Sequence, residues 1–182
     1  MSTHRHASAA EATAFAHRLL LALGVPTADA ATVARCLVLA DLRGVDTHGL
    51  MRMPGYLERL RRGLITAKPT LAIDRRTPIA GALDGQHGFG FVTATFAMAD
   101  AIAVARTYGI GIVTVRRSTH FGMAAAYVLQ AIEAGMMSMV FTNASRAMPP
   151  WGGREAFLGT SPFAAGAPGG KLPSFVLEMA PS

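Results

Sequence analysis

The sequence predicts an α/β protein in which an N-terminal helical segment precedes a mixed sheet with crossover helices. Apolar residues recur at helical spacing through the first third of the chain. From residue 71 onward, short apolar runs typical of strands alternate with helical stretches and glycine-rich turns. We therefore expect an N-terminal helical domain over 1–70 and the start of an α/β domain over 71–182.

Helix start and stop signals divide the first third of the chain into three predicted helices. Ser8 and Glu11 form a capping-box pattern, which predicts a helix that ends near Leu23. Thr27 is expected to cap a second helix, which ends near Gly44. A third helical stretch covers about 49–62. The first third is therefore expected to be entirely helical.

The remainder alternates between strand and helix patterns. Predicted strands cover 71–74, 79–84, 110–115, 137–142, 163–167 and 175–179, and predicted helices cover 91–108 and 123–134. The order of strand 110–115, helix 123–134 and strand 137–142 is typical of a crossover unit. Part of the sheet is therefore expected to be parallel.

Composition excludes several classes of protein. The 182 residues are 51% apolar and include one cysteine, which excludes a disulfide-stapled scaffold and argues against a disordered chain. Cys36 lies in an apolar helical stretch, so we expect a buried thiol. No apolar run approaches the roughly 18 residues of a membrane-spanning helix, and the N-terminus lacks a signal-peptide pattern. We expect a cytoplasmic protein without a membrane partner.

The net charge of +6 is concentrated in one region. Eight of the 17 lysines and arginines fall between Arg43 and Arg76. Such a patch attracts an anionic substrate, a dinucleotide or nucleic acid, and composition does not choose among them. The run Arg59 to Arg62 lacks interleaved aromatic residues and matches no nucleic-acid motif, so it is interpreted as a solvated helix end.

The first candidate site lies at the start of the third predicted helix. On a helix, His48, Arg52 and Tyr56 lie on one side, four residues apart. An imidazole exchanges a proton near neutral pH, and a guanidinium binds a carboxylate with two hydrogen bonds. The alternative is that Asp46 or Thr47 caps the helix while the histidine and arginine are solvated.

The second candidate site is the segment Ser118 to Gly122, which contains His120. It joins a predicted strand to a helix, and open α/β sheets bind ligands at such junctions. A capping Ser or Thr with an incidental histidine is the alternative. The glycine-rich turns lack a Rossmann or phosphate-loop fingerprint. The six histidines are dispersed, so we expect no metal site.

A third feature is the long loop over 143–160, which is rich in proline and glycine. Loops of more than roughly 12 residues are often functional. A proline-braced cover over the sheet is the alternative interpretation.

Six motifs follow one another along the chain: Ala40 to Gly49 with Arg52, and the segments 118–122, 142–145, 150–153, 158–162 and 176–180. Together and in this order they resemble the malate/L-lactate dehydrogenase family of non-Rossmann, NAD(P)-dependent oxidoreductases. The resemblance runs from about Ala12 to the end of the chain. Because members of this family are much longer chains, the resemblance implies a C-terminally truncated, incomplete family fold.

The resemblance implies roles for individual residues. His48 matches a proton donor, and Thr47 occupies the place of a serine that forms a relay with it. Arg52 matches the arginine that binds the substrate carboxylate, and Thr160 matches a substrate-contacting threonine. His120 matches a histidine near the nicotinamide that acts as the acid/base in some members. The choice between the two histidines stays open.

The resemblance also implies the ligands and partners. The cofactor is NAD or NADP, and the substrate is a small 2-oxo or 2-hydroxy acid or a related imino acid. A homodimer is expected, without nucleic acid. The implied cofactor-binding residues are His120, Phe121, Gly122, Met123, Ala124, Glu178, Met179 and Ala180.

Two other hypotheses stay open. The first is a non-catalytic remnant or subunit that requires a partner to supply the missing C-terminal half. The second is a nucleic-acid-binding module, which rests only on the basic excess between Arg43 and Arg76.

Overall fold

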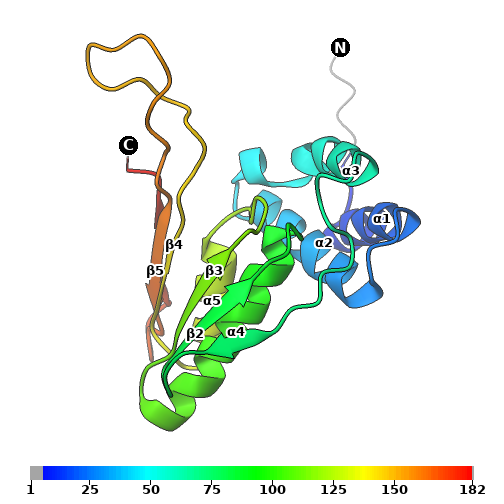
Figure 1. Cartoon of the computed structure of the whole chain (residues 1–182). Coiled ribbons are helices and arrows are strands. Elements are labelled where there is room, and N and C mark those ends of the chain that lie inside the picture. Colours follow the sequence, from blue (N-terminus) through cyan, green and yellow to red (C-terminus); the bar gives the residue numbers. More distant parts are fainter. Residues whose placement is uncertain (1–5, 182) are drawn as a thin grey trace. The chain divides into compact units, whose positions relative to one another are not determined.

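The computed structural model describes residues 6–181 and divides the chain into two compact units (Figure 1). The first unit extends to Met123, and the second begins at Ala124. Both combine helices with a three-stranded sheet, so the predicted α/β class is confirmed. The compact units divide at a different point from the expected domains, 1–70 and 71–182, which stay a prediction.

The first unit begins with two long helices, α1 (Ala9–Ala22) and α2 (Thr27–Leu42), which pack against each other. The capping box is confirmed, because the Ser8 hydroxyl accepts from the Glu11 N–H and the Glu11 carboxylate accepts from the Ser8 N–H. The predicted cap of the second helix is wrong. Pro26 occupies that position, and its fixed φ suits a helix start.

The third predicted helix, 49–62, is shorter than expected. Two 3-10 turns, η1 (Asp46–His48) and η2 (Leu50–Arg52), precede helix α3 (Met53–Arg61). His48, Arg52 and Tyr56 therefore do not follow one another along a single α-helix, which corrects the helical-face argument. A turn that changes direction at Gly49 separates the histidine from the arginine.

Asp41 explains this break in the helix. Its carboxylate accepts a hydrogen bond from the Leu50 N–H at 3.0 Å, so the first donor of η2 is satisfied by a side chain of α2. A Cβ at position 49 would lie 1.6 Å from Oδ1 of Asp41. Only glycine permits this approach of the backbone to the carboxylate.

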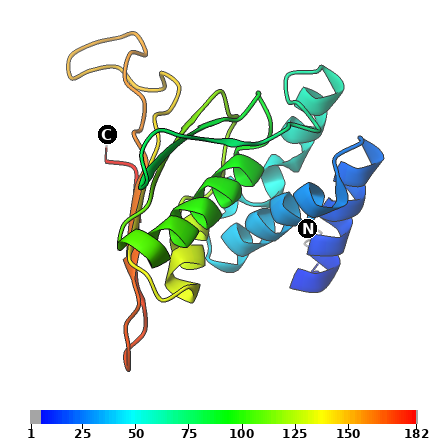
Figure 2. The same cartoon turned by 60° about the horizontal axis from the view of Figure 1, so that its bottom comes forward.

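The first sheet is mixed, as predicted. It contains β1 (Ile73–Arg75), β2 (Ala80–Asp84) and β3 (Ile112–Arg116), in that spatial order. β1 pairs antiparallel with β2, and β2 pairs parallel with β3. The parallel pair is joined by helix α4 (Gly90–Tyr108), which packs along β3. Figure 2 shows the whole chain again after a turn of 60° about the horizontal axis.

The second unit consists of helix α5 (Ala125–Glu133) and an antiparallel sheet. Its strands β4 (Ser138–Phe141), β5 (Phe163–Ala167) and β6 (Phe175–Met179) lie in sequence order, and α5 contacts all three. The predicted crossover unit is therefore wrong, because the strand after α5 joins a different sheet from β3. The parallel crossover is instead β2, α4, β3.

The core of the first unit is built largely on α2. Val33, Leu37 and Leu20 are fully buried, as the helical apolar pattern predicts. Cys36 is buried too, which confirms the expectation for the thiol, and burial raises its pKa. Within residues 6–181, no helix combines the length and apolar character needed to cross a membrane.

Replacing Leu37 with alanine is expected to reduce the free energy of unfolding by about 2–5 kcal/mol, because a cavity remains in a packed core. The matched control is Leu42→Ala near the end of the same helix, where the side chain is 68% exposed. Urea unfolding measures both variants. Equal losses for the two substitutions would contradict this description of the core.

Candidate functional site

Two segments far apart in the sequence meet in the first unit. The η1 turn carries His48, and the segment after β3 carries His120. Their imidazole rings lie with centroids 5.5 Å apart. The ring of Tyr56, from α3, stacks on His120 with a centroid distance of 6.1 Å. The structure therefore brings both predicted histidines into one cluster.

The loop that carries His120 is held against the loop that follows β2. The Gly85 N–H donates to the Arg116 carbonyl at 2.8 Å, and the Thr119 N–H and hydroxyl both donate to the Gly88 carbonyl. Because β2 and β3 are parallel, their carboxyl ends meet at one edge of the sheet. The backbone approaching His120 is thereby fixed by hydrogen bonds along this edge.

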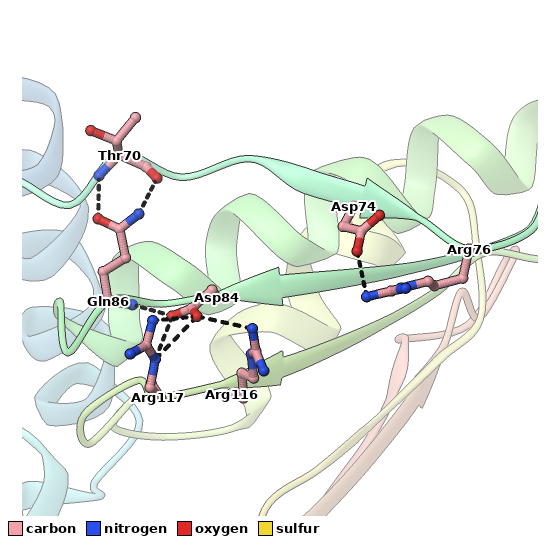
Figure 3. A network of polar contacts seen from close by, with 7 residues as sticks. All are labelled: Thr70, Asp74, Arg76, Asp84, Gln86, Arg116 and Arg117. Carbon is pink, nitrogen blue, oxygen red and sulfur yellow. Dashed lines mark hydrogen bonds and ion pairs between the residues drawn. The ribbon is translucent and has the colours of Figure 1, made fainter.

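An ion-pair cluster reinforces the same edge (Figure 3). Asp84, the last residue of β2, accepts hydrogen bonds from the Arg117 guanidinium and from the Gln86 N–H. These bonds, with the charges of Arg117 and Arg116, lower the pKa of Asp84 to about 2. The Gln86 side-chain oxygen accepts from the Thr70 N–H at 3.1 Å, and the Gln86 side-chain nitrogen donates to the Thr70 carbonyl at 2.8 Å. The loop after β2 is thus anchored on two sides.

Gly90, the first residue of α4, allows the His120 segment to lie directly against that helix. A Cβ at this position would lie 2.2 Å from the Thr119 carbonyl oxygen and 2.6 Å from the His120 carbonyl oxygen. Both contacts are with backbone, which cannot rotate away as a side chain can. A side chain at position 90 would therefore displace the histidine.

His120 and Tyr56 form a hydrogen-bonded pair with strongly perturbed titration. The Tyr56 hydroxyl lies 2.7 Å from Nδ1 of His120. Burial raises the pKa of Tyr56 to about 12, so the phenol keeps its proton near neutral pH. Burial, aided by the positive charge of Arg52, lowers the pKa of His120 to about 4. A neutral imidazole with a phenol donor at Nδ1 carries its own proton on Nε2.

His48 has a different environment. The Thr47 hydroxyl lies 3.0 Å from Nδ1 of His48, and the Thr47 carbonyl accepts a hydrogen bond from Nε of Arg52 at 2.6 Å. Thr47 therefore connects the imidazole to the guanidinium within one short segment. His48 is half-buried and Arg52 is exposed, so both remain accessible from the surface.

Tyr56 is the site residue that sequence reasoning left without a role. Its spacing of four residues from Arg52 placed it beside the first motif, but nothing in the spacing indicated a bond to His120. That bond spans 64 residues. Arg59, one turn further along α3, also lies close enough for its charge to act on the pKa of both Tyr56 and His120.

The expected cofactor segment spans the division between the two units. Its first four residues belong to the first unit, where a Cβ on Gly122 would lie 2.3 Å from the Phe91 ring. Gly122 has a φ of +74°, so glycine is required at this bend. Phe121 is half-buried, and Met123 and Ala124 are buried. The side chains of this segment are packed rather than solvated.

The remaining predicted residues lie in the second unit. Thr160 is half-buried in the loop before β5, while Met179 and Ala180 are exposed at the end of β6. Glu178 reaches the start of α5, where its carboxylate accepts from the N–H groups of Ala124 and Ala125 at 2.6 and 3.1 Å.

The first unit offers the kinds of side chain that a nicotinamide-dependent reaction would use, namely two imidazoles and an arginine. A reaction on a redox ring uses an acid/base group beside the reacting carbon, and the two imidazoles lie with their centroids 5.5 Å apart. Glu178 is engaged within the second unit, where each carboxylate oxygen accepts one backbone hydrogen bond. In the part of the chain that the structure describes, no cluster of three His, Cys, Asp or Glu side chains offers a metal site.

Comparison with known proteins decides the family. The family model for malate/L-lactate dehydrogenase matches residues 7–182. The chain belongs to this family. It is 44% identical over 172 residues to the malate dehydrogenase of Pyrococcus abyssi, a match that covers 94% of this chain and 47% of that protein.

Two further relatives agree with this assignment. The chain is 35% identical to the (2R)-3-sulfolactate dehydrogenase (NADP(+)) of Chromohalobacter salexigens, covering 96% of this chain and 52% of that one. The solved structure of malate dehydrogenase from Pyrococcus horikoshii OT3 superposes with a TM-score of 0.93 and 40% identity, over 97% of this chain and 50% of that chain. The chain thus spans about half the length of these relatives, and the predicted incomplete family fold is confirmed.

Gly90→Ala is expected to destabilise the protein by about 1–3 kcal/mol, because the added methyl group meets backbone oxygen atoms. Gly55→Ala is the matched control. It lies in α3 with nothing within 4 Å of the Cβ position, and replacing a helical glycine there is expected to be neutral or stabilising by about 0.5–1 kcal/mol. Chemical unfolding of both variants measures the difference, and changes of the same sign would contradict it.

Lowering the pH from about 6.5 to about 4 is expected to destabilise the fold through His120. The pKa of the histidine in the unfolded chain is about 6.5, whereas its pKa in the folded chain is about 4. Between these two pH values the unfolded chain binds more protons than the folded chain. The contribution of His120 to the free energy of unfolding is therefore fully present above the unfolded pKa and is lost as the pH falls toward the folded pKa. His120→Asn should flatten this part of the stability curve, measured by urea unfolding at several pH values. An unchanged slope would contradict the assigned pKa.

Proposed function

We propose that this chain carries the acid/base and substrate-carboxylate groups of an NAD(P)-dependent oxidoreductase that interconverts small 2-oxo and 2-hydroxy acids or related imino acids. One observation carries the proposal: two imidazoles from distant segments lie 5.5 Å apart beside an arginine. The names of the relatives support the substrate class, since they act on malate and sulfolactate.

The reaction requires one hydride and one proton. A reduced nicotinamide, when bound, supplies a hydride to the carbonyl carbon of the acid. Negative charge then develops on the carbonyl oxygen, and His48 neutralises it by giving up a proton from its imidazolium. Thr47 holds Nδ1 of this histidine and so directs Nε2 toward the proton transfer. In the reverse direction the same nitrogen takes the proton back.

His120 is proposed to act without changing its charge. With its pKa lowered to about 4, its imidazole is neutral at pH 7 and is a poor proton donor to an alkoxide. Held at Nδ1 by Tyr56, it offers the N–H of Nε2 to the substrate oxygen as a hydrogen bond. This assigns the acid/base role to His48 and an orienting role to His120.

Arg52 is proposed to bind the carboxylate of the substrate. Its Nε is fixed on the Thr47 carbonyl, which holds the guanidinium plane in place. A guanidinium binds a carboxylate through two parallel bonds, and this orients the adjacent carbonyl. Four further expectations stay predictions: Thr160 as a substrate contact, the nicotinamide contacts of residues 120–124, the homodimer and the cytoplasmic location. The proposed cofactor is NAD or NADP.

A second candidate is a subunit that turns over only when a partner supplies the complementary half. Its support is the length of the relatives, of which the chain spans about half. The nucleic-acid hypothesis has weaker support, because part of the basic excess is already paired. Arg75 contacts Asp100, and Arg76 contacts Asp74.

Arg52→Lys is expected to raise the KM for a 2-oxo acid about 10- to 100-fold, since an ammonium cannot make the two parallel bonds, worth about 1.5–3 kcal/mol. The kcat should change less, because the hydride and proton donors are untouched. Oxidation of NADH and NADPH, followed by absorbance, measures both constants. Arg61→Lys, on the same helix as Tyr56 and outside the cluster, is the matched control.

The same assay separates the two candidates. Turnover by this chain alone, lost in His48→Ala, supports the proposed oxidoreductase. A folded chain without turnover, whose melting temperature does not rise with either cofactor, supports the subunit hypothesis instead. Activity that survives both His48→Ala and His120→Ala would refute the proposed chemistry.

A further inference from the structure

Glu178 lies on the face of the second sheet that packs against α5. In the register of β5 and β6 it pairs with Ala164, which is fully buried. The neighbouring Gly166 shares this face, because a Cβ there would lie 2.1 Å from a methyl group of Val128 in α5. The Glu178 side chain thus extends from the sheet toward the first turn of the helix.

The first turn of α5 requires an acceptor from outside the helix. The first N–H groups of any α-helix have no partner within it, and they carry a partial positive charge. Ala124, at the N-cap position, has no side-chain acceptor. Glu178, from strand β6, supplies the acceptor. One of its carboxylate oxygens lies 2.6 Å from the Ala124 nitrogen and the other lies 3.1 Å from the Ala125 nitrogen.

We propose that Glu178 is a positioning residue that caps α5 from β6, rather than a direct ligand of the nicotinamide cofactor. In functional terms this rests on the proposed oxidoreductase, because Ala124 is the last residue of the segment expected to bind the cofactor. By bonding the backbone of Ala124, Glu178 fixes the end of that segment before any cofactor arrives. The length of the glutamate side chain matters, because an aspartate is shorter by one methylene group.

Hydrogen exchange of the cofactor-free protein tests the cap directly. In the unsubstituted chain, the Ala124 and Ala125 amides are expected to exchange at least tenfold more slowly than amides of the exposed loop over 150–157. Glu178→Ala should remove this difference, while the amides of β5 keep their protection. Glu178→Gln, which retains one acceptor oxygen, should keep part of it. Glu155→Gln is the matched control, because it removes the same charge in the exposed loop and should not change the exchange rate of either amide.

Thermal melting gives a second readout without cofactor. Loss of one helix cap lowers the melting temperature of a protein of this size by about 2–4 °C. Glu178→Ala is expected to show this shift, and Glu155→Gln is not. Should Glu178→Ala fail to fold, Glu178→Gln and the exchange rates of the unsubstituted chain still decide the question.

Titration with NADH and NADPH provides the opposing outcome. A Glu178→Gln variant with unchanged amide protection and melting temperature, but at least tenfold weaker cofactor binding, would make Glu178 a ligand and overturn the proposal. Rapid exchange of Ala124 and Ala125 in the unsubstituted chain would overturn it too. If the unsubstituted chain binds neither cofactor, the proposed function loses its support, while the exchange data still test the cap.

Discussion

The parallel pairing of β2 with β3 is the constraint on which the candidate site depends. It brings the carboxyl ends of two strands to one edge, where the Asp84 carboxylate binds the Arg117 guanidinium and the two loops exchange backbone hydrogen bonds. His120 follows within three residues of that ion pair. Its position is therefore set by a sheet edge and a helix start at Gly90, which are more rigid than an unsupported loop.

The cluster combines two imidazoles that differ in environment. His120 is hydrogen-bonded to the Tyr56 phenol, and burial and the neighbouring Arg52 guanidinium lower its pKa so that it is neutral. His48 contacts the Thr47 hydroxyl near the surface. In the proposed reaction this difference divides the work, because His48 gives up the proton while the neutral His120 orients the substrate. The positive charge of Arg52 disfavours a second cation nearby and so contributes to the lowered pKa of His120.

Much of this fold could be predicted from local pattern, and two of the errors share one cause. The capping box at Ser8 and the strands over 163–167 and 175–179 depend on neighbouring residues, and the structure agrees with them. The crossover unit and the continuous helix from residue 49 failed because distant groups decide them. A carboxylate from α2 interrupts the helix, and β4 pairs with later strands. The hydrogen bond between Tyr56 and His120 could not be predicted from the sequence for the same reason, because it joins residues 64 positions apart.

The enclosed position of Cys36 gives the chain an internal reporter. It is the one cysteine of the sequence, lies on α2 at the centre of the first unit, and has a pKa raised by burial. A thiol reagent attacks the thiolate, so it reacts there only when the surrounding helices separate. The rate of labelling therefore measures how often this core opens, without any added probe and independently of whether a substrate is known.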